Sequence, residues 1–92
     1  MKIIKFNDGL SFWIEHTEKQ ARLVIYKDGV ENVCRKSTIR KLRQFIQSDE
    51  QQLFKGRLQL VRDISGMIAV EVKGKVAGVV PAEDFLCVLI NN

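Results

Sequence analysis

The stretch ARLVIYKDGVENVCRKSTIRKLRQFIQ, residues 21–47, contains the pattern that decides the predicted fold. A β-branched and aromatic segment comes first, and Asp28-Gly29 then favours a two-residue type I′ turn, because both central positions of that turn need a positive φ. A second strand, Val30–Arg35, returns, and Ser37 is a suitable N-cap for a following helix. The apolar residues of this helix recur on one face and are Ile39, Leu42, Phe45 and Ile46. The stretch therefore predicts two antiparallel strands followed by a basic amphipathic helix.

A similar order of elements returns in MIAVEVKGKVAGVVPAEDFLCVLINN, residues 67–92. Its turn is Lys73-Gly74-Lys75, where Gly74 at the first turn position favours type II′, and Pro81 fits the first turn of the helix that follows. A further apolar strand precedes each copy, at Leu10–His16 and at Leu58–Asp63. The sequence therefore predicts an α+β fold of two tandem β-β-β-α units, with antiparallel sheets backed by two helices.

The chain of 92 residues has the length of a single domain, and its 46% hydrophobic content is that of a folded protein. We predict one domain over residues 1–92, built of two pseudo-repeats at 1–48 and 53–92. The polar linker Asp49–Gln52 is too short to separate two independent bodies. A fourth strand is recognisable only in the first unit, at Lys2–Phe6, before the turn Asn7-Asp8-Gly9.

The register between the two units is ambiguous. Aligning Lys27 with Lys73 also aligns Val30 with Val76, whereas the preceding strands need an offset two residues larger. The core face of the second unit is Ile68, Val70 and Val72, and the aligned residues are Arg22, Val24 and Tyr26, although Leu23 and Ile25 are more apolar. A slip of one residue turns every side chain to the other face. Either one turn is a residue longer or the units use opposite faces, and a chance resemblance of the two segments is a third reading.

Positive charge is concentrated in the first unit. The net charge is +4, and residues 1–48 hold ten Lys and Arg residues against five acidic residues. The density is highest over Cys34–Arg43, which contains no acidic residue. Such asymmetry suggests a polyanionic partner, while the alternative is a solvated helix face.

Several segments resemble the repeats of Pur-alpha proteins: Leu10–Ile14, Arg22–Tyr26 and Thr38–Ile46. Two segments near the end of the chain, Lys73–Val76 and Pro81–Ile90, are similar to the end of the positive-cofactor-four type of transcription coactivator. Both families have the Whirly-like fold. The resemblance implies a curved four-stranded sheet with a helix, paired into a pseudo-symmetric body. It also implies binding of single-stranded nucleic acid on the sheets, through basic and aromatic side chains. We therefore expect a small protein that binds single-stranded DNA or RNA and acts as a regulator or as a replication or recombination accessory.

The predicted interface combines cations that neutralise phosphates with aromatic rings that stack on bases. Trp13 alternates with apolar residues and so lies on the face of its strand opposite the core. If Tyr26 also points outward, it shares a face with Arg22 and, across the hairpin, with Arg35. The candidate nucleic-acid-binding residues are Trp13, Arg22, Tyr26, Lys27, Arg35, Lys36, Arg40, Lys41 and Arg43. The alternative is that the aromatic residues cover a second hydrophobic layer, and that the helical cations are simply solvated.

Residues Phe85–Ile90 of the C-terminal helix are apolar on all sides, which is typical of a helix that is fully buried or docked on a partner. Full burial is difficult in so small a protein, so we predict a homodimer interface at Phe85, Leu86, Leu89 and Ile90. This helix also carries the alternative function, a protein-interaction or assembly module.

Catalysis, metals and cofactors are not predicted. The single histidine, His16, has no Ser or Cys partner at a recognisable spacing, and Cys34 beside Arg35 has no nearby base. Cys34 and Cys87 lack metal-ligand spacing, and no Gly-rich phosphate loop is present. No signal peptide or membrane span is recognisable, which predicts a cytoplasmic protein with free thiols.

Overall fold

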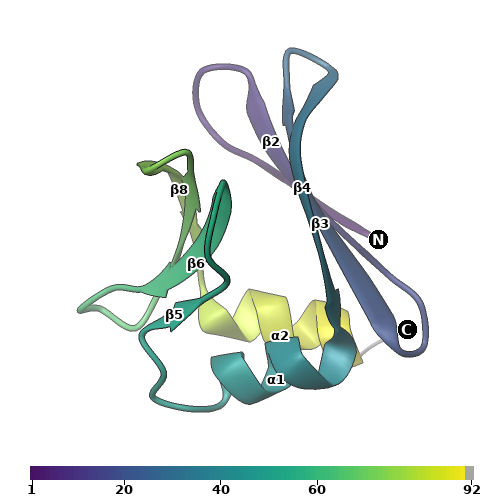
Figure 1. Ribbon diagram of the computed structural model, residues 1–92, viewed down its shortest axis with the longest axis vertical. Coiled ribbons are helices and arrows are strands. Elements are labelled where there is room, and N and C mark those ends of the chain that lie inside the picture. Colours follow the sequence, from purple (N-terminus) through teal and green to yellow (C-terminus); the bar gives the residue numbers. More distant parts are fainter. Residues whose placement is uncertain (91–92) are drawn as a thin grey trace.

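The computed structural model describes residues 1–90 and contains two four-stranded antiparallel sheets and two helices (Figure 1). In each sheet the strands are neighbours in chain order. The N-terminal sheet consists of β1 (Lys2–Lys5), β2 (Leu10–His16), β3 (Gln20–Lys27) and β4 (Val30–Thr38). The C-terminal sheet consists of β5 (Gln52–Leu53), β6 (Leu58–Arg62), β7 (Ile68–Val72) and β8 (Lys75–Val80). The helices are α1 (Ile39–Ile46) and α2 (Ala82–Ile90).

The α+β class is confirmed, and the number of strands is corrected. The second unit also has a fourth strand, β5, which pairs only two residues with β6. Two residues are too few for a period-2 pattern, so this strand leaves no signal in the sequence. Each unit is therefore β-β-β-β-α rather than β-β-β-α.

Both central hairpins have the same turn. Asp28 and Gly29 have φ values of 52° and 83°, and Lys73 and Gly74 have 53° and 84°. Two successive positive φ values define type I′, so the type II′ prediction for the second hairpin was wrong. Lys73 thus corresponds to Asp28, an offset of 73 − 28 = 45.

This offset removes the ambiguity between the two core faces. Leu23 and Ile25 now correspond to Ile68 and Val70, and all four side chains are fully buried. Both units therefore use the same face of the strand, and the turns have equal length.

A β-bulge lies in the same place in both sheets. The register shifts between Ile25 and Tyr26, where Asn32 of β4 has no residue opposite it on β3, and again between Val70 and Glu71. The bulge places Val33, rather than Asn32, opposite Ile25. Because every later side chain of β4 changes face, Lys36 rather than Arg35 lies opposite Arg22.

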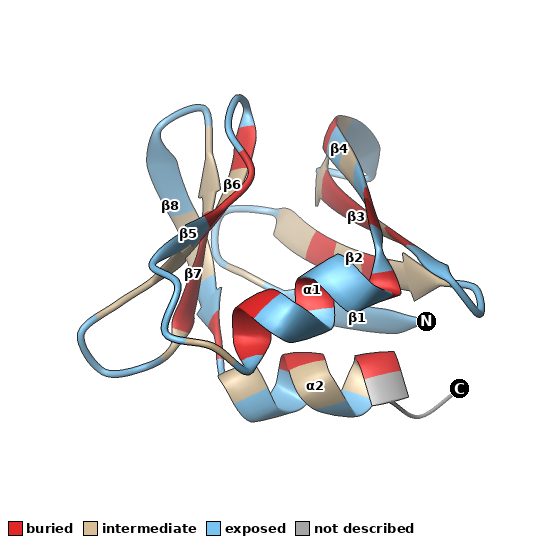
Figure 2. Ribbon diagram, turned by 60° about the horizontal axis from the view of Figure 1, so that its bottom comes forward, coloured by how far each residue is buried: buried red, intermediate tan, exposed pale blue. Residues whose placement is uncertain are grey.

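The two helices lie side by side at one end of the molecule, and each runs from its own sheet toward the other (Figures 1 and 2). Phe85 of α2 contacts Phe12 of the N-terminal sheet, with ring centroids 5.7 Å apart. At the end of α1, the Arg62 side chain of β6 donates a hydrogen bond of 2.7 Å to the carbonyl oxygen of Phe45. Each helix therefore contacts the sheet of the other unit, and we call this arrangement the exchange of helices.

Helix α1 begins one residue later than predicted. Its N-cap is Thr38, whose hydroxyl accepts a hydrogen bond of 3.1 Å from the Lys41 backbone N–H. Ser37 belongs to β4 instead and is buried there. Within residues 1–90, no helix is long and apolar enough to cross a lipid bilayer.

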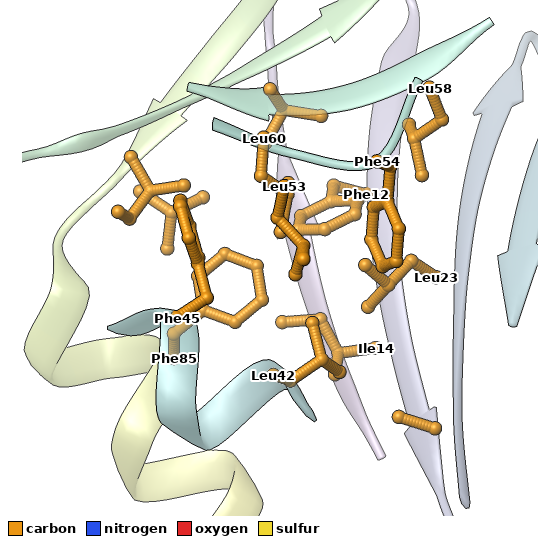
Figure 3. Close-up of a cluster of buried hydrophobic side chains, with 14 of the residues drawn as sticks. Phe12, Ile14, Leu23, Leu42, Phe45, Leu53, Phe54, Leu58, Leu60 and Phe85 are labelled. Carbon is orange, nitrogen blue, oxygen red and sulfur yellow. The ribbon is translucent and has the colours of Figure 1, made fainter. Parts of the chain in front are cut away.

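One hydrophobic cluster joins the two sheets and both helices (Figure 3). Phe12, Ile14 and Leu23 come from the N-terminal sheet, and Leu53, Leu58 and Leu60 face them from the C-terminal sheet. Leu42 and Phe45 of α1 and Phe85 of α2 fill the space at the helical end. The core therefore belongs to both repeats, and neither sheet is covered by residues of its own repeat alone.

The β1–β2 connection also contacts the C-terminal sheet, where Phe6 lies against Gly78. The Phe6 ring stacks on Phe12 at 6.0 Å, and a Cβ atom on Gly78 would collide with the Phe6 ring. Glycine is needed here because only it leaves room for the ring.

The rest of the chain buries more of helix α2 than its apolar sequence suggested. Phe85 is fully buried and Leu89 is 4% exposed, while Leu86 and Val88 are partly buried and pack against the same core. Phe85 and Leu89 therefore need no second copy of the chain to cover them. The predicted contact at Ile90 falls on a side chain outside the described part of the structure.

Candidate nucleic-acid interface

The outer face of the N-terminal sheet is the side away from the core cluster and the helices. Strand pairing places Trp13 beside Ile3 of β1 and Val24 of β3, and it places Arg22 beside Lys36 of β4. The residues that point to this face are Ile3, Lys5, Ser11, Trp13, Glu15, Arg22, Val24, Tyr26, Glu31, Cys34 and Lys36. We call this surface the outer face.

An aromatic pair lies in the middle of the outer face. The Trp13 and Tyr26 rings have centroids 4.8 Å apart and are tilted by 48°. The Trp13 indole N–H donates a hydrogen bond of 3.0 Å to the Ser11 hydroxyl, which orients the ring. Both aromatic residues are half-buried, and Val24 on the same face is fully buried, although it lies outside the main core cluster. The pair therefore covers Val24 and still presents aromatic surface to solvent.

Arg22 is held between two carboxylates. Its guanidinium donates to Glu31 at 2.7 Å and to Glu15 at 3.4 Å. Contact with the Cys34 thiol and with the Glu31 carboxylate raises the pKa of Arg22 above its ordinary high value. The charge of Arg22 is thus permanent but balanced locally. Lys36 and Lys5 are exposed on the same face, and neither forms a salt bridge to any described residue.

The structure does not bring all the predicted residues together. Trp13, Arg22, Tyr26 and Lys36 share the outer face, and Lys27 is exposed at the end of β3, next to the turn. Arg35 was expected beside Arg22, and this expectation was wrong. The bulge in β4 turns Arg35 to the inner side, where its guanidinium lies 4.8 Å from the Phe54 ring centroid.

The basic residues of α1 divide between two clefts. Arg40 and Arg43 line the helix cleft, a space of about 840 Å³ between α1 and the β2–β3 turn, to which Lys19 and Gln20 also contribute. Lys41 points to the other side of α1 and lines the linker cleft, a space beside the linker between the repeats that Arg35, Gln52, Phe54 and Lys55 also line. A hollow lined by Arg22, Lys36 and Gln20 joins the outer face to the helix cleft, because Gln20 lines both.

Three further lysines lie on the outer face or in these clefts, and they were not among the residues predicted from the sequence. Lys5 lies on the outer face, Lys19 lines the helix cleft and Lys55 lines the linker cleft. The alternation that placed Trp13 outward also applies to Lys5 through the β1–β2 hairpin, so a signal for Lys5 existed. Lys19 and Lys55 lie in connections, where periodicity carries no information about direction.

Among the described residues, no hydrogen bond joins His16 to either cysteine. His16 lies at the end of β2, with Nδ1 at 3.4 Å from the Thr17 carbonyl oxygen. Cys34 and Cys87 are exposed free thiols. Residues 1–90 contain no group of three or more His, Cys, Asp or Glu side chains that could hold a metal ion.

No protein-family model, no curated protein and no solved structure matches this chain.

Proposed function

We propose that the protein binds single-stranded DNA or RNA on the outer face. The observation that carries this proposal is the Trp13–Tyr26 pair, whose ring centroids are 4.8 Å apart on a sheet face that neither α1 nor α2 covers. Stacking of a base on an aromatic side chain contributes about 1–3 kcal/mol and does not depend on base identity. A double helix hides the flat faces of its bases, so this surface favours a single strand.

The architecture supports the same function. The Whirly-like resemblance implies a four-stranded sheet with a helix, paired into a pseudo-symmetric body, and the two β-β-β-β-α units with their shared core agree with this expectation. We therefore propose a Whirly-like fold for this chain, with the outer sheet surface as its binding surface.

The distribution of charge suggests a path for the strand. The outer face has only a small positive excess, because Glu15 and Glu31 neutralise most of the charge near Arg22. Lys36 lies between the aromatic pair and the hollow at Gln20, which Glu15 also lines. The helix cleft beyond it contains Lys19, Arg40 and Arg43 against one acidic residue, Glu18. Bases stack on Trp13 and Tyr26 in this proposal, and the phosphates continue past Lys36 toward the helix cleft.

The test uses Trp13, which is the only tryptophan of the chain, as its own reporter. Titration with a single-stranded oligonucleotide at low salt is expected to quench Trp13 fluorescence in a saturable manner. The affinity should fall steeply as salt is added, because phosphate neutralisation releases counterions. A duplex of the same length should bind more weakly.

Variants measured by fluorescence anisotropy of a labelled oligonucleotide separate stacking from charge. Trp13→Ala should weaken binding by about 5- to 150-fold, as expected for the loss of one stacked base. Lys36→Gln should lower the slope of log affinity against log salt by about 1. Lys75→Gln, an exposed lysine in the C-terminal sheet, is the matched control. Absence of binding at low salt by the wild-type protein would rule out this function.

The alternative is a protein-interaction or assembly module acting through α2, and less apolar surface is exposed there than the sequence suggested. The predicted homodimer interface lies on the same helix. Phe85 and Leu89 are already buried in the core, which leaves Leu86 among the described residues of the proposed interface. The homodimer interface predicts a dimer by size-exclusion chromatography with light scattering that is insensitive to salt and disrupted by Leu86→Asp. A monomer at the concentrations of the binding assay would exclude the homodimer.

A further inference from the structure

A cluster of three cations surrounds the linker cleft, where the two repeats meet. This cleft has a volume of about 430 Å³ and is lined by Arg35 of β4, Lys41 of α1, Gln52 of β5, and Phe54 and Lys55 of the following loop. The cations thus come from three separate segments that only the folded chain brings together. The lining contains no acidic residue.

Two of the three cations are held in place by the Phe54 ring. The Arg35 guanidinium lies 4.8 Å from the ring centroid and donates a hydrogen bond of 3.2 Å to the Lys55 carbonyl oxygen. The Lys41 ammonium group lies 5.9 Å from the same centroid. Cation–π contact orients both charges without neutralising either one.

The positive charge of this cleft is unbalanced. The only salt bridges among the described residues join Arg22 to Glu15 and Glu31, on the opposite face of the sheet. Like charges gathered without a counter-ion repel each other, so an anion bound between them would relieve the repulsion. The volume of the cleft can hold a phosphate group with part of its hydration shell.

The backbone of Phe54 supports a role in binding. Its φ is 72°, in the left-handed region that bulky residues rarely adopt. The side chain is nonetheless 8% exposed and belongs to the core cluster, where it lies between Leu23 and Leu58 (Figure 3). Such backbone strain persists only where the surrounding structure enforces it, and it is concentrated at ligand sites. Here it fixes the ring that positions Arg35 and Lys41.

We propose that the linker cleft is a phosphate-binding site, formed by Arg35, Lys41 and Lys55. Arg35 supplies planar paired donors, and the two lysines supply point charges that complete the surroundings of a tetrahedral anion. The phosphate can belong to a small free molecule or to the backbone of a nucleic-acid chain. The site does not rest on the function proposed for the outer face.

Inorganic pyrophosphate is the probe, titrated into the ¹⁵N-labelled full chain at constant ionic strength. We expect saturable shifts of the NMR signals of Arg35, Phe54 and Lys55, with no change in Trp13 fluorescence. Lys55→Gln should weaken binding by about tenfold, and Lys75→Gln should leave it unchanged. Lys55 is exposed, so its replacement should preserve the fold, which an unchanged thermal midpoint would verify.

A second titration, with a single-stranded oligonucleotide, distinguishes the two sources of the phosphate. If the cleft holds the backbone of a nucleic acid, pyrophosphate competes with the single strand, and Lys55→Gln weakens both ligands. If the ligand is a small molecule, Lys55→Gln leaves oligonucleotide binding unchanged while pyrophosphate binding falls. The proposal is overturned if the cleft signals do not saturate, if sodium chloride reproduces the shifts, or if Lys75→Gln and Lys55→Gln have equal effects. Trp13→Ala tests the outer face separately, so the two proposals can fail independently.

Discussion

Gly78 is a residue whose identity follows from a single contact. The Phe6 ring of the first repeat occupies the space that any side chain at position 78 would need, so that a Cβ atom there would overlap the ring. The equivalent position in the first repeat, at the offset of 45, is Val33. The two repeats therefore differ at this position because Phe6 reaches across to the C-terminal sheet.

Gly78→Ala is expected to destabilise the protein by about 1–3 kcal/mol, the usual cost of an extra methyl group in a filled space. The measurement is the free energy of unfolding in urea. In the background of Phe6→Ala the same substitution should cost clearly less, since the ring is absent. Additive effects in this double-mutant cycle would show that the Phe6 contact is not the cause.

At the scale of single elements, the turn between β6 and β7 is organised by one carboxylate. Asp63 Oδ1 accepts hydrogen bonds from the backbone N–H of Ser65 at 2.9 Å and of Met67 at 3.0 Å. The Ser65 hydroxyl also donates to this oxygen. These hydrogen bonds, first that of the Ser65 side chain, lower the pKa of Asp63 below its ordinary value.

Asp63 predicts a pH-dependent stability. Because its pKa is lower in the folded state, its contribution is complete at neutral pH and is lost as the pH falls below the ordinary Asp value of about 3.9. Asp63→Asn should therefore lower the thermal midpoint at pH 7, and the loss should become smaller as the pH is lowered to 3. Asp49→Asn, in the linker, is the control. An equal loss at both pH values would contradict the assignment of this effect to the carboxylate charge.

At the scale of the whole molecule, the exchange of helices makes the two repeats depend on each other. The Phe85 ring of the second repeat packs on Phe12 of the N-terminal sheet, and Arg62 of the C-terminal sheet donates a hydrogen bond to the end of α1. We therefore expect one cooperative unfolding transition. Trp13 fluorescence and far-ultraviolet circular dichroism should give the same urea midpoint.

A substitution in one repeat should consequently shift the transition seen in the other. Leu60→Ala, in the C-terminal sheet, should lower the stability reported by Trp13 by about 2–5 kcal/mol, because it removes a fully buried side chain from the shared core. Val79→Ala, at a position 45% exposed, should have little effect. An unchanged Trp13 transition in the Leu60→Ala variant would mean that the repeats fold independently.

Local pattern and turn chemistry were sufficient for much of this architecture. The alternation of residues 10–16 placed Trp13 outward, Asp28-Gly29 gave the type I′ turn, and the apolar stripe gave the buried face of α1. These features depend on residues close in the sequence, since side-chain period and turn geometry are local properties.

Only the tertiary structure decided the positions that depend on distant contacts. The bulge at Ile25 and Tyr26 separates Arg35 from Arg22 and sends it to the linker cleft, because the packing of Val33 in the core determines the register. Similarly, residues 85–90 of α2 are all apolar, but the sequence does not indicate that the opposite repeat covers Phe85. Pattern specifies which residues avoid water, whereas the identity of the surface that covers them is set by packing across the whole chain.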